Sequence, residues 1–134
     1  MKHIPAGVRD GAGGKTGSQF SGDVFNYLTM GATDGVTINT VSFTPGARTF
    51  WHSHTNGQIL LVVAGRGLTQ SEGGEVIEIA TGDTVWIPAG ESHWHGATAD
   101  SFMTHTAISL GPTVWADEVA ESHYSSATER TETA

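Results

Sequence analysis

Two closely spaced histidines, His52 and His54, are the residues of this 134-residue chain that most clearly could carry chemistry. Alternate side chains of a β-strand point to the same face of the sheet, so the two imidazoles would converge on one point. Gln58 follows four residues after His54, and His93 lies 35 residues beyond Gln58. Converging imidazoles are typical of a bound metal ion. A single histidine is more often a solvated or hydrogen-bonded residue, but three in this frame predict a metal site.

Two more histidines, His95 and His105, could act as an acid or a base beside that metal. His95 lies two residues after His93 and shares its face in a regular strand. His105 lies in a strand-like segment, residues 101–110, whose alternate positions would face the interior. A neighbouring cation lowers the pKa of an imidazole, which suits a general base near pH 7. The alternative is that both side chains hydrogen-bond to metal ligands and orient them.

Short β-strands separated by tight turns are predicted to position these side chains. Glycine is abundant, with 18 residues, and Gly-Gly at 73–74 between two strand-like segments is typical of a hairpin. The predicted strands cover residues 36–43, 48–54, 58–64 (ending at Gly65), 67–71, 75–79, 84–87, 92–95 and 101–110. So many short strands predict an all-β single domain, either a closed barrel or a two-sheet sandwich.

The two ends of the chain differ from this pattern. Residues 1–22 show little periodicity and are interpreted as an N-terminal arm with one edge strand. Residues 23–114 form the predicted barrel. Residues 115–134 are predicted to contain a short helix over 115–124, followed by a frayed tail rich in Ser, Thr and Glu.

Composition and charge argue against several classes of function. The formal net charge is −8 at pH 7, which argues against nucleic acid as a partner. The absence of cysteine excludes disulfides, thiol catalysis and zinc–thiolate sites. No apolar segment reaches the length of a signal peptide or of a membrane-spanning helix. We therefore expect a cytoplasmic protein that acts on a small molecule and binds neither nucleic acid nor membrane.

The spacing of glycines and histidines resembles the two sequence motifs of the cupin family. In the first motif the matching residues are Gly46, His52, His54, Gln58 and Gly65. In the second they are Gly82, Pro88, Gly90 and His93, with Ala97 where the family has Asn. The resemblance implies a single-domain jelly-roll β-barrel with one metal ion in its mouth. Its metal ligands would be His52, His54, Gln58 and His93.

Gln58 departs from the cupin pattern, which has an anionic glutamate at this position. A glutamine offers a neutral oxygen, so the metal would keep its full positive charge. That favours Lewis-acid chemistry on a bound hydroxyl and weakens an oxygenase role. The alternative is that the replacement has no consequence. Imidazole and amide donors suit manganese, iron, nickel or zinc, and the sequence does not choose among them.

A closer resemblance connects the chain with the bacterial manganese-dependent hydroxynitrile lyases of cupin type. The matching stretches are residues 43–49, 51–54, 57–58, 72–74, 82–83, 86, 93–96 and 103–105. This resemblance implies a lyase that reversibly cleaves cyanohydrins such as mandelonitrile to an aldehyde or ketone and hydrogen cyanide. Mn²⁺ would bind the substrate hydroxyl as a Lewis acid, and His95 or His105 would take the proton.

Four strand positions would lie beside the metal and line a pocket for the substrate. They are Asn39, Val41, Phe43 and Ser109. The same positions are equally compatible with ordinary barrel core, because alternate side chains fill the interior of a small barrel.

Two alternative functions stay open from the sequence. One is a cupin dioxygenase that acts on a small organic substrate. The other is a non-catalytic cupin that binds a metal or a small ligand. A lyase works without oxygen, so oxygen consumption separates the dioxygenase from the lyase.

Two tryptophans, Trp51 and Trp94, alternate with the histidines and should point away from the interior. Outward tryptophans on a small barrel either pack under the N-terminal arm or form an interface. Since cupins commonly form dimers or tetramers, we expect a homo-oligomer.

Overall fold

Twelve β-strands and one α-helix make up the regular structure of residues 1–8 and 13–133, the part of the chain that the computed structural model describes. The strands are β1 (Gly13–Lys15), β2 (Phe20–Ser21), β3 (Val24–Thr33), β4 (Val36–Phe43), β5 (Arg48–Thr49), β6 (His52–His54), β7 (Gln58–Ser71), β8 (Ile77–Ala80), β9 (Thr84–Ile87), β10 (His93–Ala97), β11 (Met103–Leu110) and β12 (Thr113–Trp115). The helix is α1 (Glu121–Thr133).

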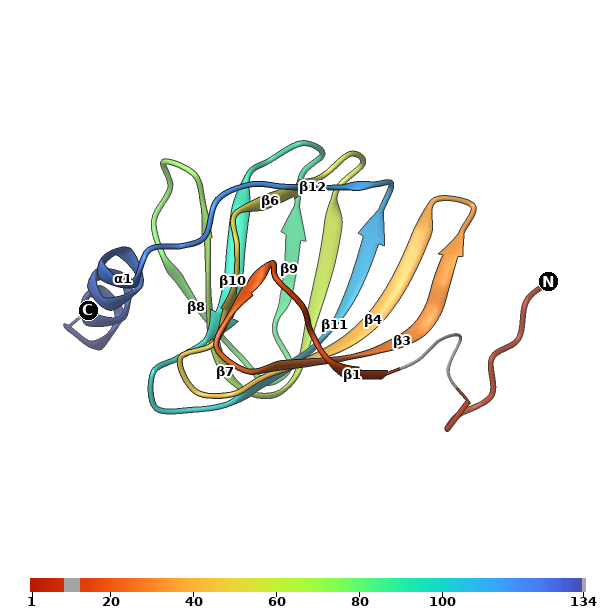
Figure 1. Cartoon of the computed structure of the whole chain (residues 1–134), viewed down its shortest axis with the longest axis horizontal. Coiled ribbons are helices and arrows are strands. Elements are labelled where there is room, and N and C mark those ends of the chain that lie inside the picture. The colour runs from red at the N-terminus through yellow and green to blue at the C-terminus, as the bar shows by residue number, and fades with distance from the viewer. Residues whose placement is uncertain (9–12, 134) are drawn as a thin grey trace.

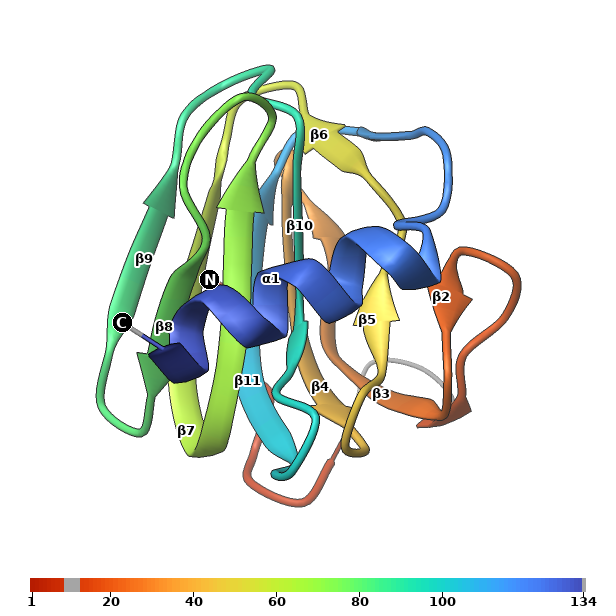
Figure 2. The same ribbon diagram turned by 90° about the vertical axis from the view of Figure 1, so that its left-hand side faces the viewer.

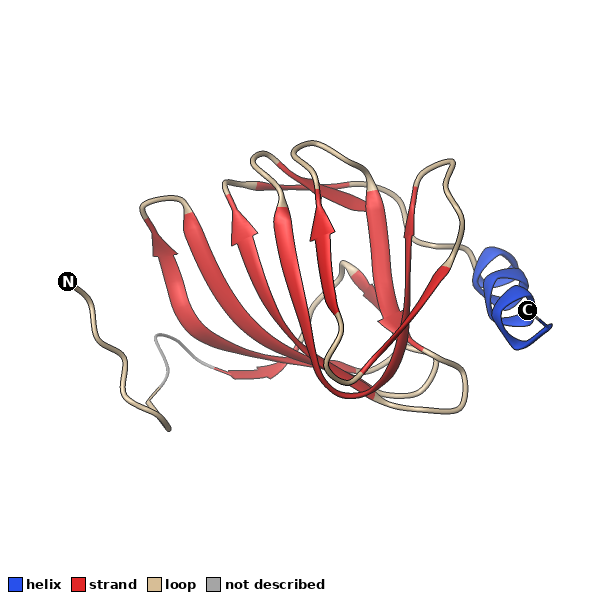
Figure 3. Ribbon diagram, turned by 180° about the vertical axis from the view of Figure 1, so that it is seen from behind, coloured by secondary structure: helices blue, strands red, loops and turns tan. Residues whose placement is uncertain are grey.

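The strands form one antiparallel sheet that curls into a half-barrel (Figure 1 and Figure 3). In spatial order the sheet runs β1-β3-β4-β11-β7-β10-β5-β2, with β8 and β9 paired to β7, and β6 paired to β10 and β12. Buried apolar side chains fill part of the interior. The larger cluster consists of Val24, Val41, Phe43, Ala47, Val62, Ile79, Ala97 and Met103. The all-β prediction is therefore confirmed, and one curled sheet replaces the two-sheet alternative.

Strand β7 joins the two halves of this sheet. The sequence predicted that a strand would end at Gly65, but β7 continues from Gln58 to Ser71. Its first part pairs with β11 and β9, and its second part pairs with β10 and β8. Gly65 has a positive φ of 78°, and a side chain there would collide with the carbonyl group of Phe102. The glycine therefore bends the strand without ending it, because it adopts this conformation at little steric cost.

The second predicted strand, which contains His52, is divided into β5 and β6 because the residues between them pair elsewhere. The N–H of Phe50 donates to the carbonyl of Gln19 at 2.9 Å. The N–H of Trp51 donates to the carbonyl of Asp117 at 2.9 Å. The segment before His52 is thus held by both ends of the chain.

The N-terminal arm contributes two short strands where the sequence predicted one. β1 pairs with β3, and β2 pairs with β5, so these two strands occupy opposite edges of the sheet. The connection over residues 16–19 passes from one edge to the other. The arm therefore spans the open side of the half-barrel, and it brings Phe20 towards the interior.

The helix begins later than the sequence predicted. Residues 115–124 were expected to be helical, but Trp115 ends β12 and the helix begins at Glu121. β12 pairs with β6, so backbone pairing with the sheet competes with helix formation in this segment. The residues expected to fray belong to the helix as far as Thr133. In the described ranges no helix is long and apolar enough to cross a membrane.

The helix covers the tryptophans that the sequence placed on the outside of the barrel. Figure 2 shows α1 lying across the outer side of the sheet. Trp94 is fully buried and packs with Val119, Tyr124 and Ala127, while Trp51 packs against the same cluster from its margin. The prediction that the N-terminal arm covers these tryptophans is therefore wrong. Trp94 is buried under α1 and is not exposed to form an interface.

Candidate metal centre

Three buried imidazoles meet in the interior of the half-barrel. The ring nitrogens of His52, His93 and His95 lie within 4.8 Å of one another. β6 supplies His52, and β10 supplies the other two from alternate positions. His52 and His93 are direct partners in the β6–β10 pairing, so the sheet register itself brings them together.

Backbone carbonyl groups orient two of these rings. Nδ1 of His52 lies 2.8 Å from the carbonyl oxygen of Phe50, and Nδ1 of His93 lies 2.9 Å from that of Glu91. A carbonyl oxygen only accepts hydrogen bonds, so each Nδ1 carries the proton and donates. Each Nε2 is then an unprotonated lone-pair donor, which is the form that a metal ion binds.

Gln58 and His93 present two acceptor atoms to each other. Oε1 of Gln58 lies 3.1 Å from Nε2 of His93, while its amide nitrogen donates to the hydroxyl of Ser109 at 3.0 Å. Burial lowers the pKa of His93, so its ring is neutral near pH 7 and has no second proton to offer Oε1. Two buried acceptors that face each other in this way fit a shared cation.

His54, another predicted ligand, lies next to these residues but outside the group of three histidines whose ring nitrogens lie within 4.8 Å of one another. Its ring centroid lies 5.1 Å from that of His52 and 5.6 Å from that of His93. Nδ1 lies 3.1 Å from the hydroxyl of Thr113, whereas Nε2 is buried without a hydrogen-bond partner in the described structure. A buried polar atom left unpaired is costly, and a bound metal ion removes that cost.

His95 and His105 form a buried pair beside these residues. Nε2 of His105 lies 2.9 Å from Nδ1 of His95, and one of the two donates to the other. The remaining nitrogens, Nε2 of His95 and Nδ1 of His105, are buried and have no partner within the described ranges. The sequence predicted both residues as acid–base candidates. The structure also brings His95 into the group of three histidines that could hold a metal ion, which the sequence pattern did not indicate.

Burial keeps all five histidines neutral near pH 7. It lowers the pKa of His54 to about 4 and that of His105 to about 4. The pKa of His52 is lowered well below its usual value, first by burial and then by the neighbouring His93. Burial and the neighbouring His105 act in the same way on the pKa of His95. The carboxylate of Glu91 acts on His93 in the opposite direction but does not outweigh burial. Neutral imidazoles can bind a divalent cation without adding negative charge to it.

A cavity of about 100 Å³ opens beside the histidines. Of the four predicted pocket residues, Asn39, Val41 and Ser109 line it. Phe43 lies in the apolar core instead, with its ring 5.2 Å from that of His105. The prediction missed five lining residues: Phe20, Thr49, Ala107, Thr113 and Trp115. Alternation over residues 113–115 could have indicated the last two, but no local signal marks Phe20.

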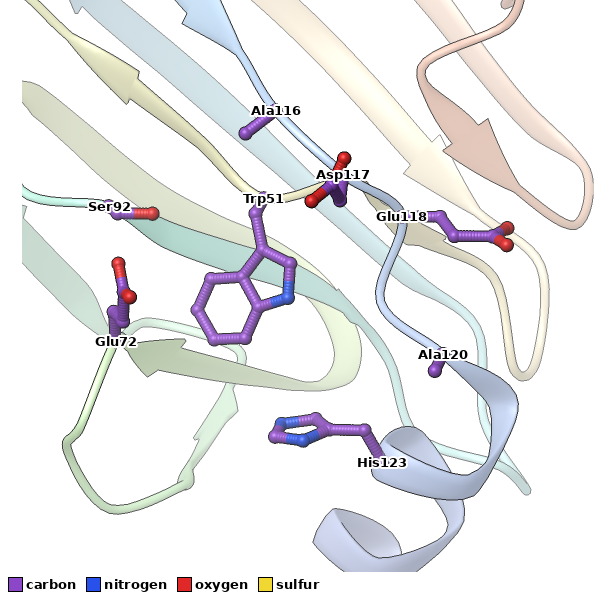
Figure 4. Close-up of a pocket in the computed structure, with 8 residues that line it drawn as sticks. All are labelled: Trp51, Glu72, Ser92, Ala116, Asp117, Glu118, Ala120 and His123. Carbon is purple, nitrogen blue, oxygen red and sulfur yellow. The ribbon is translucent and has the colours of Figure 1, made fainter.

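A larger cleft of about 450 Å³ lies outside the barrel, between the sheet and α1. Figure 4 shows Trp51 in this cleft, with His123 of the helix on one side and Glu72 on another. Nε2 of His123 lies 2.8 Å from Oε1 of Gln70. The cleft contains none of the five interior histidines.

Comparison with known proteins agrees with this architecture. The family model described as "Cupin domain" matches residues 39–108, more than half of the chain. The chain belongs to the cupin family. The solved structure of a cupin-like protein from Thermotoga maritima is similar over 90% of this cupin and 97% of that chain, with 38% identity and a TM-score of 0.82. A cupin from Bacteroides fragilis is 27% identical and has a TM-score of 0.55, over 60% of this chain and 69% of its own.

One curated relative has a named activity. The (R)-mandelonitrile lyase of Granulicella tundricola is 51% identical to this cupin over 88 residues. The alignment covers 63% of this chain and 67% of the lyase. The resemblance to the cupin-type lyases that the sequence predicted is thereby confirmed, and three buried histidines of this cupin could hold a divalent metal.

Proposed function

We propose that this cupin is a metal-dependent lyase that reversibly cleaves cyanohydrins to an aldehyde or ketone and hydrogen cyanide. The observation that carries the proposal is the juxtaposition of a neutral donor set with a buried histidine pair. The donor set proposed from the cupin resemblance consists of His52, His54, Gln58 and His93, and the pair consists of His95 and His105. His52 and His93 also belong, with His95, to the group of three histidines that could hold an ion. The 51% identity to a mandelonitrile lyase supports the reaction class.

These four residues would hold a divalent ion, which would act as a Lewis acid that lowers the pKa of the substrate hydroxyl. The family resemblance favours Mn²⁺, and the donor chemistry also suits Fe²⁺, Ni²⁺ or Zn²⁺. The protein's contribution to that acidity would be a ligand set without an anionic member. Gln58 supplies a neutral oxygen, and none of the described residues that line the cavity is an aspartate or a glutamate. The amide geometry is fixed by the hydrogen bond that Gln58 donates to Ser109.

The histidine pair would move the proton. An unprotonated ring nitrogen of the pair takes the hydroxyl proton, and the bond between His95 and His105 spreads the resulting charge over two rings. As the oxygen electrons form the carbonyl group, the carbon–carbon bond breaks and its electron pair leaves with cyanide. The imidazolium then returns the proton to cyanide, which departs as hydrogen cyanide, so the protein is regenerated.

The pocket residues would hold the substrate during this transfer. Asn39 and Ser109 offer polar groups beside the histidines, and Val41 offers an apolar wall. Phe43 lies in the apolar core, where its ring packs against both His95 and His105 and would fix their positions.

The test is cleavage of mandelonitrile by purified protein whose metal content is known from elemental analysis. The assay is run without oxygen, and hydrogen cyanide and benzaldehyde are measured together. We expect equimolar release of both products. A requirement for oxygen would indicate the dioxygenase instead, and a metal-loaded protein that releases no cyanide from any cyanohydrin would indicate a binding module.

A further inference from the structure

An aromatic pair stands where the interior cavity meets solvent. Phe20 of β2 and Trp115 of β12 both line the cavity, with ring centroids 5.7 Å apart. The ring of Trp115 also lies 4.7 Å from that of His52 at an angle of 35°. Trp115 remains 38% exposed, so one part of its indole is buried over the metal centre and another part is open to solvent.

The size of the cavity decides where a substrate's substituent can lie. The cavity holds about 100 Å³, whereas an engineered cavity that binds benzene measures about 150 Å³. The hydroxyl-bearing carbon and the nitrile group of a cyanohydrin fit in the cavity beside the histidines. The cavity has no room for a phenyl ring in addition to these two groups. The substituent must therefore extend to the opening, where Phe20 and Trp115 lie.

The residues that line the cavity also differ between its inner end, beside the histidines, and its opening. Oδ1 of Asn39 is buried without a hydrogen-bond partner in the described structure, and Thr49 and Ser109 add hydroxyl groups. These polar groups suit the reacting end of the substrate. The opening instead presents two aromatic rings, which favour an aromatic or apolar substituent through edge and face contacts.

We propose that Phe20 and Trp115 bind the substituent of the substrate and give the site a preference for aryl over small alkyl groups. The identity of the reacting end rests on the proposed lyase function. The preference itself rests on the cavity size and on the position of the aromatic pair.

Turnover of two cyanohydrins measures this preference. For the wild type we expect a higher kcat/KM with mandelonitrile than with acetone cyanohydrin. Phe20→Ala and Trp115→Ala should each lower the ratio of the two kcat/KM values at least fivefold. Phe102→Ala is the matched control, because Phe102 is 51% exposed and does not line the cavity. An unchanged ratio in both cavity variants would overturn the proposal.

A binding measurement separates this proposal from the lyase function. Acetate and benzoate are titrated into Mn²⁺-loaded protein, and binding is followed by the relaxation of water protons. We expect wild type to bind benzoate at least fivefold more tightly than acetate, and Phe20→Ala to remove the difference with its manganese content unchanged. Equal affinities in wild type would contradict the aromatic subsite, whether or not any cyanohydrin is cleaved.

A second, independent feature is an uncharged outer face on the sheet. The register of β9, β7, β11, β4 and β3 places five apolar residues in one row across it: Trp86, Ile59, Ile108, Ile38 and Met30. The neighbouring row is Thr84, Leu61, Thr106, Thr40 and Tyr27. All ten are exposed or half-buried, and none is charged.

The absence of charge on this face is informative because the chain is acidic. The chain has fourteen acidic and six basic residues and a net charge of −8, so two copies repel each other over most of their surfaces. The ten side chains of the two rows are uncharged and add nothing to that repulsion. Four strands spaced about 4.8 Å apart present about 26 Å of length each, and β9, with four residues, presents about 13 Å, so the face covers roughly 560 Å². That is about two thirds of the roughly 800 Å² that each partner buries in a stable complex.

We infer that a second copy of this chain docks on the uncharged outer face to form a symmetric dimer. A flat, uncharged face that meets its own copy satisfies the self-complementarity that a two-fold interface requires. This surface replaces the one expected from the sequence, because Trp94 is covered by α1.

The mass of the protein in solution tests the dimer. Sedimentation at about 50 μM should give twice the 14.0 kDa of one chain. Leu61→Glu and Thr106→Lys place a charge on the face and should each give the mass of one chain, with the circular dichroism spectrum of the wild type. Ile77→Glu is the matched control, since Ile77 is 57% exposed on β8, outside the two rows, and should leave the dimer intact. A wild-type monomer, or a dimer that survives both face variants, would overturn the inference.

Discussion

The two faces of β10 carry histidine-containing clusters that differ in how their polar atoms are paired. On the outer face, Gln70 accepts hydrogen bonds from the indole N–H of Trp94 at 3.0 Å and from Nε2 of His123 at 2.8 Å, and it donates to the carbonyl of Gly74 at 2.9 Å. On the inner face, His54 and His95 each bury an Nε2 that has no partner among the described residues.

This difference separates a structural cluster from a functional one. Buried polar groups in folded proteins are nearly all hydrogen-bonded, so the unpaired imidazole nitrogens of the inner cluster need a different explanation from the paired groups of Gln70, Trp94 and His123. The outer cluster anchors α1 to the sheet. Among the described residues, the protein alone leaves the Nε2 atoms of His54 and His95 unpaired, and under the proposed function a cation and a substrate would complete the inner cluster.

Removal of a metal ligand from the inner cluster should have the largest effect on activity. His52→Ala deletes a ring whose Nδ1 is already held by the carbonyl of Phe50, so it removes an oriented donor. We expect loss of bound manganese and a fall in kcat of at least about a thousandfold. His123→Ala on the outer face should change neither the manganese content nor kcat by more than about twofold. Elemental analysis and cyanide release measure both variants, and a fully metal-loaded His52→Ala protein would remove it from the ligand set.

Replacement of the proton-transfer pair should be the next largest effect. His105→Gln removes an imidazole that contacts His95 but lies outside the group of three histidines that could hold an ion. We expect kcat to fall about a hundredfold, the usual contribution of a general base, while the manganese content stays the same. Turnover by this variant at the wild-type rate would show that His105 takes no part in proton transfer.

The pH dependence of stability offers a test without any substrate. The folded-state pKa values of His54 and His105 are lowered to about 4, so the unfolded chain binds more protons than the folded one between about pH 6.5 and 4. Stability of the metal-free protein should be complete above pH 6.5 and should be lost as the pH falls towards 4, by up to about 1.4 kcal/mol per unit for each histidine.

Urea unfolding between pH 7 and 4.5 measures this loss. His105→Gln should show a shallower dependence than wild type, because it lacks one of the five buried histidines whose pKa is lowered. The outer variant His123→Ala should retain the full dependence. Equal slopes in all three proteins would contradict the assignment to the inner cluster.

A change of charge at the fourth predicted ligand should have a smaller effect. Gln58→Glu keeps the oxygen and adds a negative charge beside His93. We expect tighter manganese binding and about a tenfold lower kcat, because an anionic ligand reduces the acidity of whatever the ion binds. Manganese titration and cyanide release measure the two quantities separately. A variant with unchanged kcat would show that the neutral ligand has no catalytic consequence.

The smallest effect is expected on the outer face. Trp94→Phe preserves an aromatic ring in the core but removes the N–H that donates to Gln70. The free energy of unfolding should fall by about 1–2 kcal/mol, from the lost hydrogen bond and the smaller ring, with turnover unchanged. A loss of turnover larger than the loss of folded protein would show that the two faces are coupled.

Spacing in the sequence was sufficient for the parts of the site that lie on single strands. His52 and His54 share a face because they alternate on β6, and His93 and His95 do so on β10. The contact between His52 and His93 comes from the pairing of β6 with β10, which local spacing does not contain. The position of Phe20 depends on an arm that crosses the open side of the sheet, so no local pattern of residues indicates it.

The errors in the fold have a similar origin. Gly65 is typical of a strand end, yet tertiary pairing on both sides carries β7 through it. Residues 115–120 have helix-compatible side chains, but Trp115 pairs with His52 and the helix begins only at Glu121. In both segments long-range hydrogen bonds override a local preference.

The central claim is that the inner histidines hold one metal ion and that this ion makes the site a lyase. Metal-free protein is titrated with Mn²⁺ under anaerobic conditions, and the initial rate of hydrogen cyanide release from mandelonitrile is measured at each step. We expect no release without metal, a linear rise, and a plateau at one ion per chain. Full release without metal, or none at one bound ion per chain, would contradict the claim.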